Sequence, residues 1–74
     1  MLVKFENYHD GDCWCARGIG EDIFAQGKTL DKLMENIKEA VSLHFEEEIK
    51  QKGVMEILTI SEAEVEYVPE VASS

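Results

Sequence analysis

Apolar and polar residues alternate at the start of the chain. Over residues 2–8, Val3 and Phe5 fall on one side and charged residues on the other, which is the period of a strand with one buried face. The segment 9–12 that follows reads His-Asp-Gly-Asp. Asp-Gly is typical of tight hairpin turns, because glycine readily adopts a positive φ. We therefore predict a β-hairpin whose second strand covers about residues 12–19.

A second turn and a short third strand follow the hairpin. Gly18 and Gly20 mark the turn, and residues 23–26 form the strand, which ends at Gly27. In the second strand, alternation separates two sets of side chains. Trp14 and Ala16 take one face, while Cys13, Cys15 and Arg17 take the other.

The segment after Gly27 has the pattern of an amphipathic helix. Thr29 can cap its first turn, and no glycine or proline interrupts it before Gly53. We predict one helix of about twenty residues, roughly 30 Å long. Its predicted buried stripe comprises Leu30, Leu33, Met34, Ile37, Val41, His44 and Glu48, flanked by Ala40 and Phe45.

The C-terminal part of the chain indicates a last strand. Residues 54–60 are apolar but irregular, whereas residues 63–68 alternate before Pro69. We predict the strand at 63–68 and a frayed tail at 70–74. The chain is then a single α+β domain over residues 1–69 with the order β-β-β-α-β. The last strand can run parallel to an earlier one, and the helix covers one sheet face only.

Composition limits the partners. The 74 residues include 16 Asp and Glu against 7 Lys and Arg, which gives a net charge of −9 and room for one small domain. Nucleic acids and anionic membranes attract basic proteins, so we expect this chain to bind neither directly. A basic protein partner would instead be attracted.

The chain is expected in the cytoplasm. No apolar run approaches the roughly 18 residues of a membrane span, and the first residues lack the layout of a signal peptide. One closely spaced pair of cysteines is also no disulfide framework.

Few residues suggest chemistry. On an extended strand the sulfurs of Cys13 and Cys15 would lie about 7 Å apart, and no second Cys or His pair has zinc spacing. We interpret both as structural thiols, with a metal or redox site as the alternative. His44 is interpreted as a packed residue at the helix boundary. We predict no catalytic residue, cofactor or metal, and therefore no enzyme.

Exposed apolar residues point to association. Leu43 falls nearly opposite the buried helix stripe, and several apolar residues share the sheet face that the helix leaves open. A contiguous apolar patch on a sheet usually marks an interface. We therefore expect a homodimer or higher oligomer. The self-association candidates are Leu2, Tyr8, Cys13, Cys15 and Phe24.

Acidic residues cluster at the helix end and on the predicted last strand. They are either solvated charge or an electrostatic surface for a basic partner. The partner-binding candidates are Glu46, Glu47, Glu48, Glu64 and Glu66, together with Leu43.

Three short motifs resemble the HicB-like antitoxin family. They are residues 25–27 (Ala-Gln-Gly), 29–30 (Thr-Leu) and 35–40 (Glu-Asn-Ile-Lys-Glu-Ala). The resemblance covers about residues 1–50. It implies a trimmed ribonuclease-H-like layer in which the fourth strand lies alongside the first. It also implies that the chain neutralises a small basic HicA-type toxin, which cleaves mRNA, by direct binding.

The chain also departs from the pattern of this family at its C-terminal part. Many family members carry a C-terminal module that binds operator DNA, and the 21 residues after Gly53 are too few for one. We therefore expect a short antitoxin of the stand-alone type. The alternatives are an orphan ligand-binding or scaffolding oligomer without a toxin, and a relict nuclease whose carboxylates would have to converge on one point.

Overall fold

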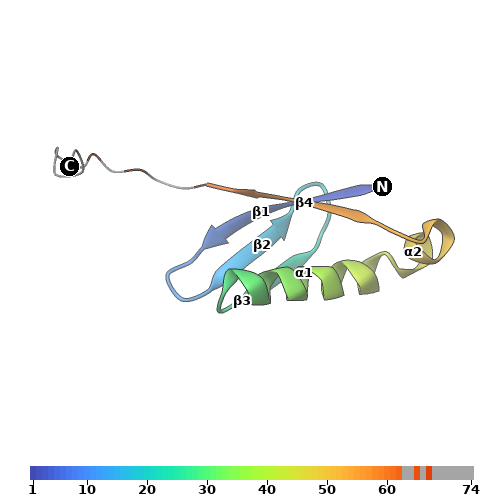
Figure 1. The fold of residues 1–74 in the computed structure, drawn as a ribbon, viewed down its shortest axis with the longest axis horizontal. Coiled ribbons are helices and arrows are strands. Elements are labelled where there is room, and N and C mark those ends of the chain that lie inside the picture. The colour runs from blue at the N-terminus through green and yellow to red at the C-terminus, as the bar shows by residue number, and fades with distance from the viewer. Residues whose placement is uncertain (63–64, 66, 68–74) are drawn as a thin grey trace, which may run out of the picture.

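The computed structural model describes residues 1–62, 65 and 67, and the fold is α+β (Figure 1). Within these residues the chain forms three strands, two helices and a fourth strand. The elements are β1 (Leu2–His9), β2 (Trp14–Gly18), β3 (Phe24–Gly27), α1 (Leu30–His44), α2 (Glu46–Lys52) and β4 (Glu56–Ser61). The α+β class is confirmed, whereas the single long helix is not. The tail predicted at 70–74 lies outside the described residues.

The strands form one mixed sheet in the order β3-β2-β1-β4. β1 and β2 are antiparallel, as are β2 and β3, and β4 runs parallel to β1. The predicted hairpin is confirmed, because Gly11 adopts a φ of 98° and the Asp10 amide donates to the Cys13 carbonyl at 3.1 Å. The fourth strand lies alongside the first, as the family resemblance implies.

The position predicted for the last strand is wrong. β4 covers Glu56–Ser61 rather than residues 63–68, and of the latter only Val65 and Tyr67 are described, both exposed and outside any strand. The physical reason lies in the parallel pairing with β1, where Ile57 stands opposite Val3. Leu58 and Ile60 are apolar too but lie on the opposite face of β4 from Ile57, so the sequence of β4 does not alternate between apolar and polar residues.

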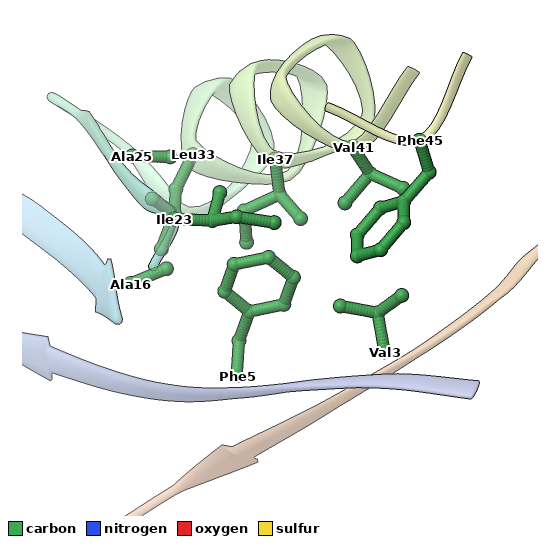
Figure 2. Close-up of a cluster of buried hydrophobic side chains, with 9 residues drawn as sticks. All are labelled: Val3, Phe5, Ala16, Ile23, Ala25, Leu33, Ile37, Val41 and Phe45. Atoms are coloured by element: carbon green, nitrogen blue, oxygen red, sulfur yellow. The ribbon is translucent and has the colours of Figure 1, made fainter. Parts of the chain in front are cut away.

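The core lies between the sheet and α1. Figure 2 shows Val3 and Phe5 pointing from β1 toward the side chains of α1. The helix therefore covers one sheet face, as predicted. The buried cluster comprises Val3, Phe5, Ala16, Ile23, Ala25, Leu33, Ile37, Val41 and Phe45.

A tight junction joins β3 to α1. A Cβ atom on Gly27 would lie 2.6 Å from the backbone nitrogen of Leu33, so only glycine allows the helix to approach this closely. Thr29 caps the helix, since its hydroxyl accepts a hydrogen bond from the Lys32 amide at 3.1 Å. The cap agrees with the sequence prediction, and so does the end of β3 at Gly27.

The predicted twenty-residue helix is interrupted at Phe45. This residue leaves helical geometry, with φ −114° and ψ 33°, and its side chain is buried in the core. The hydrogen bonds from the Phe45 amide to Val41 and from the Ile49 amide to Phe45 continue across the bend. Packing of the aromatic ring therefore turns the chain without glycine or proline. α2 then ends at Gly53, whose φ is 82°.

The predicted helix stripe is correct only in its centre. Leu33, Ile37 and Val41 are buried, but Leu30 is 50% exposed. His44 is also exposed, with its ring edge against Phe45 at 4.8 Å between centroids. Leu30 is the first residue of the helix. Among the described residues, no helix is long and apolar enough to cross a membrane.

Candidate functional site

The sheet face opposite α1 carries exposed apolar side chains. Alternation along the strands places Leu2, Tyr8 and Phe24 there, as predicted, and each is 40–55% exposed. Leu58 and Ile60 of β4 join them, because they pair with Lys4 and Glu6. Sequence reasoning missed these two residues, since it placed the last strand too late. We call this surface the open sheet face.

An ion pair crosses the middle of the open sheet face. Arg17 of β2 pairs with Glu6 of β1, and the two residues are direct neighbours in the strand register. The Arg17 guanidinium also lies 6.0 Å from the centroid of the Tyr8 ring. The face is thus apolar and charged at once, which is typical of an interface that forms from separately folded chains.

A groove runs between β3 and α1. Phe24, Gln26, Glu39, Ala40 and Leu43 contribute to its walls, and its volume is about 400 Å³. Leu43 is 72% exposed. The structure therefore brings together a partner-binding candidate, Leu43, and a self-association candidate, Phe24. We call this surface the β3–α1 groove.

The three consecutive acidic candidates lie in the first turn of α2. Glu46 and Glu47 are exposed, whereas Glu48 is half-buried. The Glu47 carboxylate faces the Lys50 ammonium at 4.0 Å, so part of the charge is paired. Carboxylates in this position are also favoured by the helix dipole. The remaining acidic candidates, Glu64 and Glu66, lie outside the described residues.

The hairpin between β1 and β2 gathers a carboxylate and two thiols. The ligand atoms of Asp10, Cys13 and Cys15 all lie within 4.8 Å of one another. The separation of about 7 Å expected for the two sulfurs is wrong, because Cys13 belongs to the turn and β2 begins only at Trp14. We call these three residues the hairpin cluster.

The hairpin cluster contains two of the self-association candidates. Cys15 points to the side of the open sheet face but is buried, and Cys13 is only half-exposed. Neither thiol therefore offers much surface to a second chain. The open sheet face retains Leu2, Tyr8 and Phe24 from the predicted set.

The hairpin fixes the protonation of two of these groups. Hydrogen bonds from the amides of Cys13 and Asp12 hold the pKa of the Asp10 carboxyl below its usual value. Burial raises the pKa of the Cys15 thiol, and the nearby Asp10 carboxylate raises it further. In the absence of a bound cation, Asp10 is therefore ionised and Cys15 is neutral at pH 7.

A polar side chain is buried near the end of β1. Asn7 is only 6% exposed, and its Oδ1 atom has no hydrogen-bond partner among the described residues. Asn7 also borders a hollow of about 550 Å³ with His9 and Trp14, whose rings meet edge to face at 5.0 Å. Sequence reasoning did not select Asn7, because alternation marks only a core position there.

Comparison with known proteins identifies one relative. A UPF0150 protein of Archaeoglobus fulgidus is 44% identical over 47 residues, which are 64% of this chain and 68% of the relative. No family model matches the chain, and no solved structure matches it significantly. Identity at this level over two thirds of the relative goes beyond a shared fold class. The chain belongs to the UPF0150 family.

Proposed function

We propose that the chain is a non-enzymatic HicB-like antitoxin that acts in the cytoplasm by binding a small basic HicA-type ribonuclease. The observation that carries this proposal is its membership in UPF0150, a family of HicB-like type. The motifs at the strand-to-helix junction, which resemble that family, agree with this membership. The net charge of −9 favours a basic partner.

The β3–α1 groove is the docking surface that we propose for this ribonuclease. Leu43 and Phe24 offer apolar contact area, and Glu39 adds a carboxylate at the same place. The acidic first turn of α2 follows directly after α1 in the chain. An apolar centre with charge near it is the arrangement in which a few central residues supply most of the binding energy.

We further propose that two copies of the chain associate through the open sheet face. Leu58 and Ile60 extend the apolar positions predicted there across the β1–β4 pair. The Arg17–Glu6 pair at the centre of this face would set the orientation of the two copies. Sedimentation of the chain alone tests this point. A clean monomer at tens of micromolar would contradict it.

Co-expression tests the antitoxin function. The small basic protein encoded beside this chain should arrest growth when expressed alone, and the chain should restore growth and co-purify with it. A harmless neighbour would contradict the proposal and favour an orphan binding or scaffolding domain.

Two sets of variants separate the apolar and the electrostatic contributions. Leu43→Asp should weaken binding of the purified basic partner about tenfold or more, mainly through faster dissociation. Leu30→Asp is the matched control, because Leu30 is also exposed on α1 but lies outside the groove. Reversal of all three charges at Glu46, Glu47 and Glu48 should instead slow association and reduce its salt dependence.

A further inference from the structure

Hydrogen bonds within the hairpin hold the Asp10 carboxylate in place beside the Cys15 sulfur. The Oδ1 atom of Asp10 accepts hydrogen bonds from the amides of Asp12 at 2.8 Å and Cys13 at 2.9 Å. These bonds fix the carboxylate so that its other oxygen, Oδ2, faces the Cys15 sulfur at 3.6 Å. The turn itself therefore presents an ionised oxygen to a buried sulfur.

The separation of Asp10 and Cys15 agrees with that of two ligands in a tetrahedral zinc site. With Zn–S bonds of about 2.3 Å and Zn–O bonds of about 2.1 Å, a ligand sulfur and a ligand oxygen lie about 3.6 Å apart, and two sulfurs about 3.8 Å apart. The Asp10–Cys15 separation of 3.6 Å already has this value. All three ligand atoms lie within 4.8 Å of one another. Cys13, which belongs to the turn, therefore needs to move its sulfur by only about 1 Å.

We propose that Asp10, Cys13 and Cys15 bind one Zn²⁺ ion, with a water molecule in the fourth position. Binding releases one proton from each thiol to the solvent and replaces water ligands of the hydrated ion by two zinc–sulfur bonds and one zinc–oxygen bond to Asp10, while one water molecule stays bound. The Gln26 amide oxygen lies 3.9 Å from the Cys13 sulfur, beside the proposed site. The site has three protein ligands and one open position.

Charge and ligand type select the ion. Two thiolates and a carboxylate carry three negative charges, of which the Asp10 charge is already part of the net charge of −9. Thiolates favour Zn²⁺ over Mg²⁺ or Ca²⁺, which prefer sets of oxygen ligands. Arg17, two residues beyond Cys15 on the same strand, is paired with Glu6. Its positive charge is therefore compensated locally.

Cobalt substitution tests the site directly. The full chain, reduced and kept under anaerobic conditions, is titrated with Co²⁺ and then with Zn²⁺. Tetrahedral thiolate ligation should produce intense visible bands and a sulfur-to-cobalt charge-transfer band that saturate at one ion per chain and disappear when Zn²⁺ displaces Co²⁺. Absence of the charge-transfer band would refute the proposal.

Three variants identify the ligands. Loss of an outer-shell partner typically weakens metal binding about 10–100-fold, so loss of a direct ligand in Cys13→Ser or Asp10→Asn should weaken it about 100-fold or more. Asp10→Asn retains an Oδ1 acceptor for the turn, and Cys13 is not in the core, so circular dichroism should show both variants folded. Asp12→Asn is the matched control, because Asp12 is an exposed carboxylate of the same turn outside the cluster.

Two results in these variants would overturn the assignment. The first is undiminished binding in Cys13→Ser, and the second is an equal loss of affinity in Asp12→Asn and Asp10→Asn. Mass spectrometry of the purified chain gives a further check. If the reduced chain is exposed to air with Zn²⁺ present, so that oxygen is the oxidant, a Cys13–Cys15 disulfide that forms and excludes the ion would also contradict the proposal.

Discussion

Replacement of Ile37 by alanine probes the packing that holds α1 on the sheet. The Ile37 side chain is fully buried in the core between α1 and the sheet. Truncation of a fully buried isoleucine costs about 2–5 kcal/mol, from lost burial and from the cavity that remains. A chain of 74 residues is expected to have a free energy of unfolding of about 4–11 kcal/mol. Ile37→Ala should therefore remove a large fraction of the total stability.

Leu30→Ala is the matched comparison for this experiment. Leu30 belongs to the same predicted stripe but is 50% exposed, so its truncation should cost about 1 kcal/mol or less. Urea unfolding followed by circular dichroism, at one protein concentration, measures both. With an m value of about 1 kcal/mol/M, Ile37→Ala should lower the midpoint by about 2 M or more. Equal midpoints for the two variants would refute the assigned position of α1.

Three further predictions concern the junction, the buried amide and the hairpin. Gly27→Ala should destabilise the chain by about 1–3 kcal/mol, because the added Cβ meets the Leu33 backbone at 2.6 Å, and thermal unfolding should show a lower Tm. Asn7→Val should stabilise the chain by about 1 kcal/mol, since it removes a buried oxygen without a partner among the described residues; an unchanged or lower Tm would contradict this. In the metal-free chain the pKa of the Cys15 thiol is higher in the folded state than its ordinary value of 9.0. The folded state therefore has its full stability below pH 9.0 and loses part of it as the pH rises from there through the pKa of the folded state. In Cys15→Ser the free energy of unfolding, measured by denaturant titration, should fall less at alkaline pH than in the unmodified chain. Identical pH profiles of the two chains would show that Cys15 is not the group responsible.

Local signals predicted much of the fold. The Asp-Gly turn, the Thr29 cap and the end of the third strand at Gly27 each depend on one or two residues, and the structure confirms all three. These features follow from backbone geometry and short-range hydrogen bonds. Gly27 and Thr29 also belong to the junction on which the family resemblance rests.

Long-range packing decided the features that the sequence did not reveal. Phe45 ends α1 because its ring enters the core, although no helix-breaking residue is near. β4 forms at Glu56–Ser61 because Ile57 pairs with Val3, although residues 63–68 alternate more clearly. Periodicity alone cannot decide which of two segments forms a strand, since that depends on how well each packs against the partner strand.

Some candidate site residues could be predicted from local sequence patterns, whereas others depend on the folded structure. Leu43 was visible as an exposed position on a helical pattern, and the acidic residues of α2 as a cluster of charge at the helix end. The hairpin cluster was not, because its geometry depends on Cys13 belonging to the turn rather than to β2. Asp10 enters that cluster through hydrogen bonds to the turn, which spacing along the chain does not reveal.

Titration of the basic partner's ribonuclease activity with the purified chain tests the central proposal most directly. Cleavage of mRNA should fall to background as the chain is added, and Leu43→Asp should require a higher concentration than Leu30→Asp for the same inhibition. Cleavage that continues at saturating concentrations of the chain, or equal inhibition by the two variants, would contradict an antitoxin that acts through the β3–α1 groove.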